Sequence, residues 1–489
     1  MPYLNARDLL AALLEPGTFR SWDTDPADVR PGPAYAAQLA RAREVTGLDE
    51  SVVTGEGLLG GHRVAVAACE FGFLGGSIGV AAGERLTLGI ERATAGRLPL
   101  IVLPASGGTR MQEGAVAFLQ MVKITAAVAA HKNARLPYLA YLRHPTTGGV
   151  YASWASLGHL TLAEPGALIG FLGPRVYEAL HGAPFPEGVQ TAENLHARGL
   201  VDAVVPQAGL AAYLGRVLTA LTPAPRDAVR AEAAPDAGTA ETTPDAGASA
   251  WESVRRTRLP GRPGPADLIR LAATDVVMLR EAGLILALAR IGAHPCVIIA
   301  HDRSGPPPAP GTLRLARRGM RLAEGLRLPL VTMIDTPGAE LSREAEEQGL
   351  ASELAQCLAS LITLRTPTVS VLLGQGTGAA ALAFLPADRV LAAQHAWLAP
   401  IAPEGASAIL YRDTAHAAEL AARQGIRSAD LASRGIVDQV VAETSAGQFC
   451  RDLGRALHAQ IEDLATWDEG TRMARRRHRY RHAGIPRTG

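Results

Sequence analysis

Two short glycine turns in this chain of 489 residues have the composition of sites that hold a negatively charged oxygen. One is PTTGGV, residues 145–150, and the other is GQGTGAAA, residues 374–381. Each follows an apolar run and precedes a stretch of helical character. Successive backbone N–H groups at a helix start can converge on one oxygen, which is the construction of an oxyanion hole. Two such turns predict two oxyanion sites in one chain.

A third glycine-rich segment, GFLGGSIG at residues 72–79, leads into the helical stretch GERLTLGIERA. Glycines allow the backbone to approach a ligand closely, and a helix N-terminus favours negative charge. The spacing fits neither a Walker loop nor a dinucleotide-binding fingerprint. Taken alone, the segment is compatible with a ligand-binding loop and equally with a plain tight turn.

The side chains that could act as acids or bases have simpler structural interpretations. His144 abuts the first turn without a Ser or Cys in a nucleophile elbow, so a hydrogen-bonding role is favoured. Glu113 could be a base, but an acid at a helix N-terminus is the more economical interpretation. Asp335 predicts an Asx-type turn after a buried strand. Asp202 and Asp438 recur in the two halves and are expected to fix the same turn twice.

The sequence contains an internal repeat that explains why the glycine turn occurs twice. RLPLIVLPASGG and RLPLVTMIDTPG place Pro99 and Pro329 at an offset of 329 − 99 = 230 residues. Pro137 and Pro367 keep the same offset, 367 − 137 = 230. HARGLVDAVV and ASRGIVDQVV close the two halves at an offset of 432 − 196 = 236. The halves are therefore predicted to share one fold.

Each half alternates apolar strand-like runs with helical patterns, such as those at residues 109–134 and 339–364. This alternation predicts an α/β fold with parallel strands and crossover helices. Residues 223–250 are rich in Ala, Pro, Asp, Glu and Thr and include PDAG twice, which predicts a flexible tether. The second half is expected to begin near Trp251.

Composition narrows the class of protein. The formal net charge is +1, so no field predicts nucleic acid as a partner. The basic run RRRHRYRH, residues 475–482, is expected to be a solvated tail, or else to dock an anionic partner or a CoA phosphate. No apolar run suggests a membrane helix, and no signal peptide is visible, so we expect a cytoplasmic protein. The scattered cysteines predict neither a zinc ribbon nor a disulfide framework: Cys69, Cys296, Cys357 and Cys450.

Long stretches of the chain resemble the carboxyltransferase of bacterial acetyl-CoA carboxylase. The first half resembles its β subunit in GFLGGSIGVAAGERLTLGIERA, SGGTRMQEG, LPYLAYLRHPTTGGVYASWASLGHLTLAEPGALIGFLGPRV and GLVDAVVP. The second half resembles its α subunit in AWESVRRTR, CVIIAHDR, RLAEGLRLPLVTMIDTPGA, EEQG, APEGASAIL and GIVDQVV. The two halves look like these subunits fused in one polypeptide.

The resemblance implies a duplicated crotonase-like fold of two ββα-spiral domains, the first for acyl-CoA and the second for carboxybiotin. It implies a helical N-terminal segment 1–56 without zinc ribbon, a first domain 57–222 and a second domain 251–465. The linker 223–250 would join the domains, and a basic tail 466–489 would follow them. Gly148 and Gly149 match the turn that holds the thioester oxygen, and Gly378, Ala379 and Ala380 match the turn for the biotin ureido oxygen. The further expected acyl-CoA contacts are Gly75, Gly76, Ser106, Gly107, Gly108 and Arg110. The expected biotin-side contacts are Thr336, Pro337, Gly338 and Gly376.

The resemblance also implies partners. Biotin would arrive as carboxybiotin on a separate carrier protein, since no biotinylation sequence and no ATP-grasp region are visible. Biotin carboxylase would likewise be a separate chain. The active site would lie between the first domain of one protomer and the second domain of another, so a homo-oligomer of at least two copies is expected. No zinc is expected.

One departure from the family pattern bears on the chemistry. The second turn has Ala379–Ala381 where the family has Gly-Gly-Ala, and a positive φ would be costly for alanine. The alternatives are therefore a biotin-independent decarboxylase or a specialised acyl-CoA carboxylase of the same fold. A non-catalytic scaffold is a third alternative, although Gly148 and Gly149 argue against it.

Overall fold

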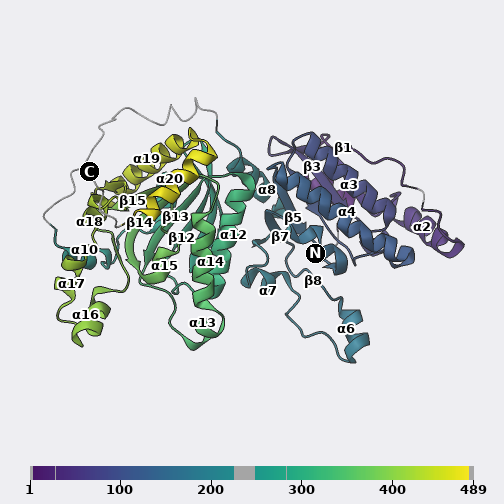
Figure 1. Ribbon diagram of the computed structural model, residues 1–489. Helices are drawn as coiled ribbons and strands as arrows, with labels where there is room; N and C mark the ends of the chain where they lie inside the picture. Colours follow the sequence, from purple (N-terminus) through teal and green to yellow (C-terminus); the bar gives the residue numbers. More distant parts are fainter. Residues whose placement is uncertain (1–3, 28, 225–247, 282, 484–489) are drawn as a thin grey trace. The chain divides into compact units, whose positions relative to one another are not determined.

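The computed structural model describes residues 4–27, 29–224, 248–281 and 283–483. Most of the tether predicted at residues 223–250 therefore lies outside the described residues. The chain divides into two compact units, Met1–Leu218 (unit 1) and Thr219–Gly489 (unit 2) (Figure 1). The division falls just before the predicted tether.

Unit 1 is a mixed α/β unit whose elements follow the strand–helix alternation expected from the sequence. Its strands are β1 (Arg20–Ser21), β2 (Val52–Leu59), β3 (His62–Cys69), β4 (Leu100–Leu103), β5 (Tyr138–Leu142), β6 (Thr146–Thr147), β7 (Leu160–Ala163), β8 (Ile169–Gly170) and β9 (Ala203–Val204). Its helices are α1 (Ala6–Leu13), α2 (Pro33–Thr46), α3 (Val80–Ala95), α4 (Gly114–Asn133), α5 (Gly148–Tyr151), α6 (Pro174–His181), α7 (Ala192–Ala197) and α8 (Gln207–Leu221). Short 3₁₀ turns lie at Leu74–Gly76, Met111–Glu113 and Trp154–Ser156.

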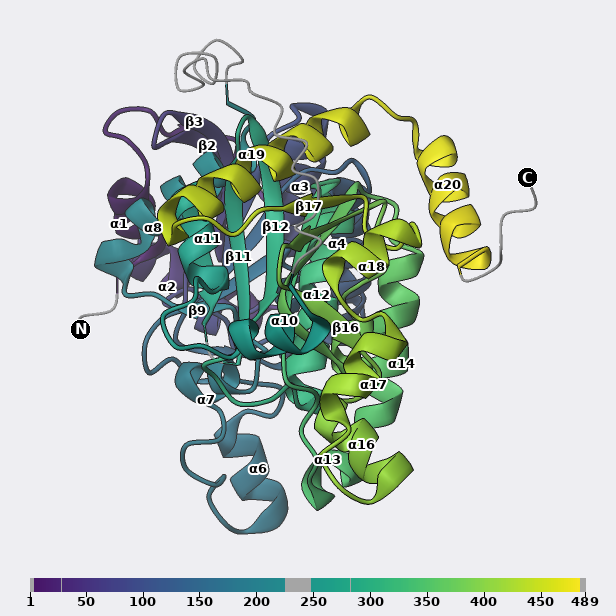
Figure 2. The ribbon, with the colours of Figure 1, turned by 90° about the vertical axis from the view of Figure 1, so that its left-hand side faces the viewer.

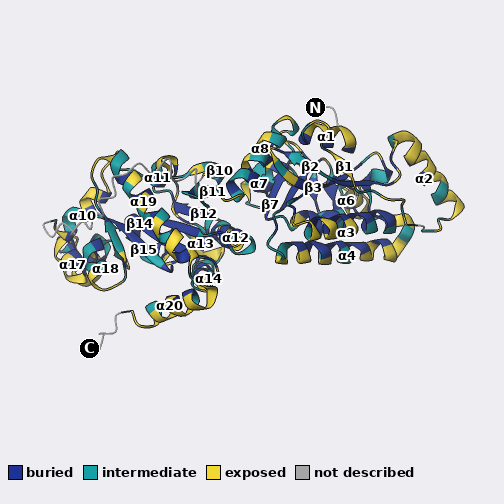
Figure 3. Cartoon of the chain, turned by 90° about the horizontal axis from the view of Figure 1, so that it is seen from above, coloured by how far each residue is buried: buried dark blue, intermediate teal, exposed yellow. Residues whose placement is uncertain are grey.

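The main sheet of unit 1 has the strand order β1-β2-β3-β4-β5-β7-β9. The pairs β1/β2 and β2/β3 are antiparallel, and the remaining neighbours are parallel. The helices α3 and α4 run side by side, and their inner faces are buried (Figure 3). Because parallel strands end at one edge, the loops after β3, β4 and β5 meet there.

Unit 2 repeats this plan. Its strands are β10 (Thr274–Arg280), β11 (Leu284–Ile291), β12 (His294–His301), β13 (Leu330–Thr336), β14 (Thr368–Thr377), β15 (Arg389–Ala393), β16 (Trp397–Ala399) and β17 (Gln439–Val441). Its helices are α10 (Ala250–Thr257), α11 (Pro265–Ala272), α12 (Pro310–Leu326), α13 (Arg343–Glu347), α14 (Leu350–Ile362), α15 (Gly378–Leu382), α16 (Pro403–Tyr411), α17 (Ala417–Gln424), α18 (Ser428–Ser433), α19 (Ala446–Ala465) and α20 (Glu469–Arg481).

The sheet of unit 2 has the order β10-β11-β12-β13-β14-β15-β17, with β16 pairing to β14. Again the first two pairs are antiparallel and the rest are parallel. The long helix α19 lies across β11 and β12 (Figure 2).

The register of the two sheets confirms the duplication at the level of single residues. Leu100 of β4 pairs with Tyr138, and Leu330 of β13 pairs with Thr368, which is the same pairing displaced by 230 residues. Asp202 accepts a hydrogen bond from the backbone N–H of Thr161, 2.7 Å, and Asp438 accepts one from that of Val390, 2.6 Å. The recurring aspartates therefore do fix equivalent turns.

The two ends of the chain differ from their sequence-based expectations. The segment 1–56 is not wholly helical, because β1 extends the main sheet and β2 already begins at Val52. The basic run, expected to be solvated, lies largely in α20. Arg476 of this helix is buried and forms an ion pair with Asp388, 2.6 Å. A buried guanidinium needs such a partner, and the pairing fixes the helix on unit 2.

The segment Met111–Asn133, which contains α4, is long and apolar enough by composition to span a membrane, and 39% of its most apolar window is buried. Its inner face packs in the core, whereas Phe118, Leu119 and Val122 are exposed on the outer face. An apolar helix of this length is equally compatible with packing in a protein core.

Candidate functional site: two oxyanion turns

The first candidate turn follows β5 and begins α5. Gly148 has a φ of 62°, a left-handed conformation that only glycine adopts readily. Its N–H donates to the carbonyl of Phe171, 3.0 Å, so this donor is already engaged. In the described part of the chain the N–H of Gly149 has no acceptor, as expected for the first turn of a helix. The donor available for a ligand oxygen is therefore that of Gly149.

The loop after β4 lies against this turn. Gly108 approaches it so closely that a Cβ there would lie 3.3 Å from the nitrogen of Gly149. The N–H of Gly108 donates to the hydroxyl oxygen of Ser106, 3.0 Å. Thr147 N–H donates to the carbonyl of Ser106, 2.9 Å. These bonds hold the loop and the turn together.

The glycine loop at residues 72–79 joins the same cluster. Gly107 N–H donates to the carbonyl of Gly75, 2.9 Å. Gly76 has a φ of 61°, and a Cβ there would lie 2.0 Å from the carbonyl oxygen of Ala105. A side chain at position 76 is therefore excluded both by the left-handed backbone conformation and by the lack of space. The structure brings Gly75, Gly76 and Gly108 together beside Gly149.

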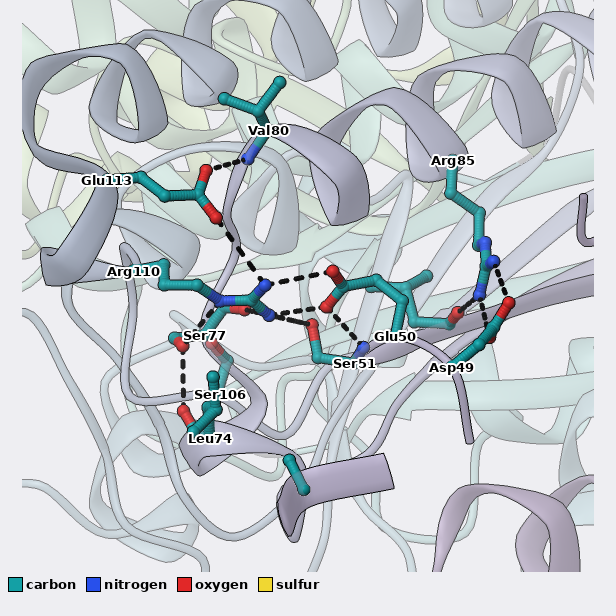
Figure 4. Close-up of polar contacts among 12 residues, drawn as sticks. Asp49, Glu50, Ser51, Leu74, Ser77, Val80, Arg85, Ser106, Arg110 and Glu113 are labelled. Atoms are coloured by element: carbon teal, nitrogen blue, oxygen red, sulfur yellow. Dashed lines mark hydrogen bonds and ion pairs between the residues drawn. The ribbon is translucent and has the colours of Figure 1, made fainter. Parts of the chain in front are cut away.

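Arg110 has a different environment from the one expected of a CoA ligand (Figure 4). Its side chain is fully buried and forms a two-nitrogen ion pair with Glu50, whose closer contact is 2.5 Å. It also donates to the hydroxyl of Ser51, 3.0 Å, and to the carbonyl of Ser77, 2.8 Å. A guanidinium with these partners stabilises the loops that carry the site and does not face a ligand.

Glu113 forms an end cap, but on a helix other than its own (Figure 4). Its carboxylate accepts the N–H of Val80, 2.6 Å, at the start of α3, and a hydrogen bond from the hydroxyl of Tyr35. Burial and the bond to Glu113 raise the pKa of Tyr35 to about 12. The N-terminus of α3, expected to attract a ligand anion, is therefore occupied by a carboxylate of the protein.

A cavity of 670 Å³ opens beside this cap. Its lining includes Tyr35, Gln38, Val80, Gln112 and Glu113. The volume lies within the range of small-molecule sites, about 300–1,000 Å³. Its lining includes none of the predicted acyl-CoA contacts, which are Gly75, Gly76, Ser106, Gly107, Gly108 and Arg110.

His144 has the structural role favoured from its sequence context. Its Nδ1 accepts the N–H of Leu168, 3.1 Å, and its own backbone N–H donates to Glu164, 3.0 Å. Neither contact directs the imidazole ring toward Gly149, where a base would have to act.

The second candidate turn, at the end of β14, has the same backbone. Gly378 has a φ of 69° and begins α15, as Gly148 begins α5. Thr336 repeats the role of Ser106, because its hydroxyl accepts the N–H of Gly338, 3.2 Å. Thr336 pairs with Gly376 across β13 and β14, so the predicted biotin-side residues lie together. Among the described residues, the N–H groups of Gly378 and Ala379 have no acceptor.

The alanines of the second turn are not strained. The residues with positive φ in this segment include Gly378 but none of Ala379, Ala380 and Ala381. Those three lie in α15, whose geometry suits alanine well. The expected cost of alanine at this turn is therefore absent, since the one left-handed position is a glycine.

Asp335 does more than form a local turn. It is buried, and its Oδ1 accepts the N–H of Gln375, 2.9 Å, which ties the end of β13 to β14. Its Oδ2 accepts from Arg303, 3.2 Å, and lies 4.0 Å from Arg262. Burial raises the pKa of Asp335, and the two arginines oppose this change. The Asx-turn interpretation missed this long-range role.

The sequence interpretation also missed Glu70 and Arg143, two buried charged residues directly after β3 and β5. A charge immediately after an apolar strand was the available signal. In the described part of the chain, no group of three or more His, Cys, Asp or Glu residues could hold a metal ion.

Comparisons with known proteins agree with this geometry. Residues 6–446 match the carboxyl transferase domain family. The chain is 56% identical, over 100% of both chains, to the probable biotin-dependent acyl-coenzyme A carboxylase beta3 subunit of Mycobacterium tuberculosis. It is 39% identical, over 99% of this chain and 92% of the relative, to the acetyl-coenzyme A carboxylase carboxyl transferase subunits beta/alpha of Salinispora arenicola.

Among solved structures, the fold is similar to transcarboxylase 12S with hydrolysed methylmalonyl-coenzyme A bound. The TM-score is 0.75 at 20% identity, covering 94% of this chain and 90% of the other. This likeness confirms the crotonase-like fold in two sheet domains. With a family match across most of its length, the chain belongs to the carboxyl transferase domain family.

Proposed function

We propose that the chain is the carboxyltransferase component of a biotin-dependent acyl-CoA carboxylase, which transfers a carboxyl group from carboxybiotin to acetyl-CoA to give malonyl-CoA. The observation that carries this proposal is the pair of equivalent turns with unengaged backbone N–H groups, at Gly149 in unit 1 and at Gly378 and Ala379 in unit 2. A reaction with two oxyanions needs two such sites.

In unit 1, the N–H of Gly149 would donate to the thioester oxygen as the α-carbon loses its proton and charge moves onto that oxygen. The glycines of the neighbouring loops let those loops pack closely against the turn. Because the donor is fixed by α5 and by the contact with Gly108, it is already in place before charge develops.

In unit 2, the N–H groups of Gly378 and Ala379 would donate to the ureido oxygen of biotin. Carboxybiotin, brought as a co-substrate by a separate carrier chain, would supply the carboxyl group and a ureido nitrogen able to take the proton. The unit 2 turn would hold that ring in place and stabilise the negative charge on its oxygen. No side-chain base is needed in this scheme, which agrees with the structural roles of His144 and Glu113.

The decarboxylase alternative loses its motive. It rested on alanines at the second turn, and these occupy unstrained helical positions. The two turns have equivalent backbones, which supports a function that uses both.

We further propose that the active enzyme contains at least two copies, with unit 1 of one copy facing unit 2 of another. Unit 1 exposes Phe118 (64%) and Leu119 (61%) on α4, and unit 2 exposes Ile409 (70%) and Leu410 (63%) on α16. Exposed apolar patches of this kind mark interaction surfaces. A Leu119→Glu variant should sediment as a smaller species than the unaltered protein; an unchanged mass would contradict this part of the proposal.

The function is tested with the purified full chain, malonyl-CoA and free biotin, by following loss of malonyl-CoA and formation of acetyl-CoA. Biotin-dependent turnover is expected, and methylmalonyl-CoA in place of malonyl-CoA, with propionyl-CoA as its product, tests which acyl chain is preferred. Absence of turnover with every acyl-CoA would refute the proposal, and malonyl-CoA loss without biotin would favour the decarboxylase. Carrier and biotin carboxylase are proposed as separate cytoplasmic partners, to be identified by reconstituting the forward reaction.

A further inference from the structure

The start of the described chain is bound at one edge of the unit 1 sheet. The turn Thr147–Gly149, the acyl-side turn of the proposed function, lies at the same edge. Two buried charged residues make the contact: Glu70, the first residue after β3, and Arg143, the first residue after β5. They are 4% and 0% exposed. Buried charges are costly unless paired or hydrogen-bonded, so their partners matter.

Glu70 connects the N-terminal helix to the glycine loop. One carboxylate oxygen accepts the N–H of Ala6, 2.7 Å, at the first position of α1. The other accepts the N–H of Gly72, 2.8 Å, where the glycine loop begins. One side chain thus fixes both segments, and each bond is strengthened by the negative charge.

Arg143 connects the same segment to the acyl-side turn. Its guanidinium donates to the carbonyl of Leu4 and to that of Cys69, the latter at 3.0 Å. Its own carbonyl accepts the hydroxyl of Thr146, 2.8 Å, two residues before Gly148. A movement of Leu4 is therefore passed through Arg143 toward the turn.

We propose that residues Leu4–Ala6 position the acyl-CoA half of the active site, by holding Glu70 and Arg143 and, through them, the glycine loop and the acyl-side turn. This inference rests on the proposed function and assigns a role to the start of the segment 1–56. Unit 2 holds its own turn through Asp335, so the effect is confined to the acyl-CoA side.

The contact can be cut without removing α1. The helix is anchored by Leu9, Leu10 and Leu13, all buried. Ala6 is its first residue, a position where proline is well tolerated, and Asn5 before it has φ −65° and ψ 169°, which suits a residue preceding proline. Ala6→Pro removes the N–H that Glu70 accepts. Ala6→Gly keeps that N–H and is the matched control.

We expect Ala6→Pro to raise the KM for the acyl-CoA about tenfold, the size of one lost charge-assisted hydrogen bond. The apparent KM for free biotin should change less than about twofold, because a change at one site has little effect on a site with which it shares no contacts. Glu70→Gln should give a similar change, and Ala6→Gly almost none. The double variant Ala6→Pro with Glu70→Gln should show little further loss, because both changes remove one contact.

Three results would overturn the inference: an unchanged KM for acyl-CoA in Ala6→Pro, an equal rise for biotin and acyl-CoA, or additive effects in the double variant. The affinity of each variant for the acyl-CoA, measured by calorimetry without turnover, is a second readout. If the unaltered protein neither binds nor converts acyl-CoA, the proposed function fails. If it does both and Ala6→Pro matches it, only the positioning role fails.

Discussion

In unit 1, the turn Thr147–Gly149 is supported by two charged residues at the strand ends, Glu70 and Arg143, and by the N-terminal segment Leu4–Ala6. At Thr377–Ala379 an equivalent turn is held by Asp335, which accepts the N–H of Gln375 and pairs with arginines. The counterpart of Asp335 in unit 1 is a buried alanine, Ala105, since 335 − 230 = 105. Duplication preserved the backbone of the turn and one left-handed glycine, whereas the supporting side chains are not equivalent.

The donors of the two turns differ as well. Gly148 has given its N–H to Phe171, while Gly378 has no such acceptor in the described part of the chain. The turn of unit 1 therefore has the unengaged N–H group of Gly149, and the turn of unit 2 has those of Gly378 and Ala379. Under the proposed function each half would act on a different oxygen, and variants of each turn test this difference.

The largest effect is expected from Gly149→Pro, because proline has no N–H and Gly149 carries the unengaged donor of the acyl-side turn. The rate of carboxyl transfer should fall by about 10²–10³. Gly149→Ala keeps the N–H and is the control, although its Cβ would lie 3.1 Å from the hydroxyl of Thr109. Unchanged turnover in the proline variant, with a native circular dichroism spectrum, would show that this turn is not the oxyanion site.

A loss of stability is expected from Asp335→Asn, since it leaves Arg303 without its buried negative partner. Breaking a buried pair costs about 3 kcal/mol or more in free energy of unfolding. Denaturant unfolding measures it, with Asp302→Asn, a less buried aspartate, as the control. If both variants lose equally little, Asp335 is not the support that distinguishes unit 2.

A smaller effect is expected from Gly378→Ala, because alanine at a φ of 69° costs about 1–2 kcal/mol. The added Cβ would also lie 3.4 Å from the carbonyl oxygen of Pro400. We expect a moderate rise in the apparent KM for biotin and little change for acyl-CoA. Ala379→Gly, which relieves no strain because Ala379 is helical, should behave as the unaltered protein; improved transfer in that variant would restore the idea that the alanines impair the turn.

The smallest effect concerns pH and an ion pair specific to unit 2. The hydrogen bond from Arg258 holds the pKa of Glu404 below its usual value, and Arg258 also donates to Gln375 beside the turn. A depressed carboxylate pKa contributes stability above the unfolded-state pKa, and this contribution is lost as the pH falls through the folded-state value. The pair is partly exposed, so we expect less than about 1 kcal/mol.

The test compares thermal unfolding of the unaltered protein and of Glu404→Gln from neutral pH to about pH 3, where the difference between them should vanish. A difference that persists at the lowest pH would mean that the carboxylate charge is not its source.

The sequence predicted the parts of the site that depend on backbone. The 230-residue offset, the strand–turn–helix order and the glycines at Gly148 and Gly378 all appear in the structure where expected. These features are local, because a left-handed residue or a buried strand is marked by its own residue types. The resemblance to carboxyltransferases, carried by long motifs, gave the family correctly.

Roles of charged side chains were predicted less well. Arg110, expected to contact CoA, is buried against Glu50, and the basic run contains Arg476, buried against Asp388. Glu113 caps α3 and not its own helix. Each partner is distant in sequence, and neither periodicity nor spacing along the chain indicates which carboxylate meets which arginine.

By itself, the sequence determined the duplicated α/β fold, the family and the two turns that can hold an oxyanion, because these follow from hydrophobic periodicity, glycine conformation and repeated motifs. The tertiary structure alone decided which backbone donors are unengaged and that the alanines of the second turn are unstrained. It also decided that Leu4, 139 residues before Arg143, supports the first turn. The physical reason is that hydrogen bonds and ion pairs form between groups that folding brings within about 3 Å, whatever their separation along the chain.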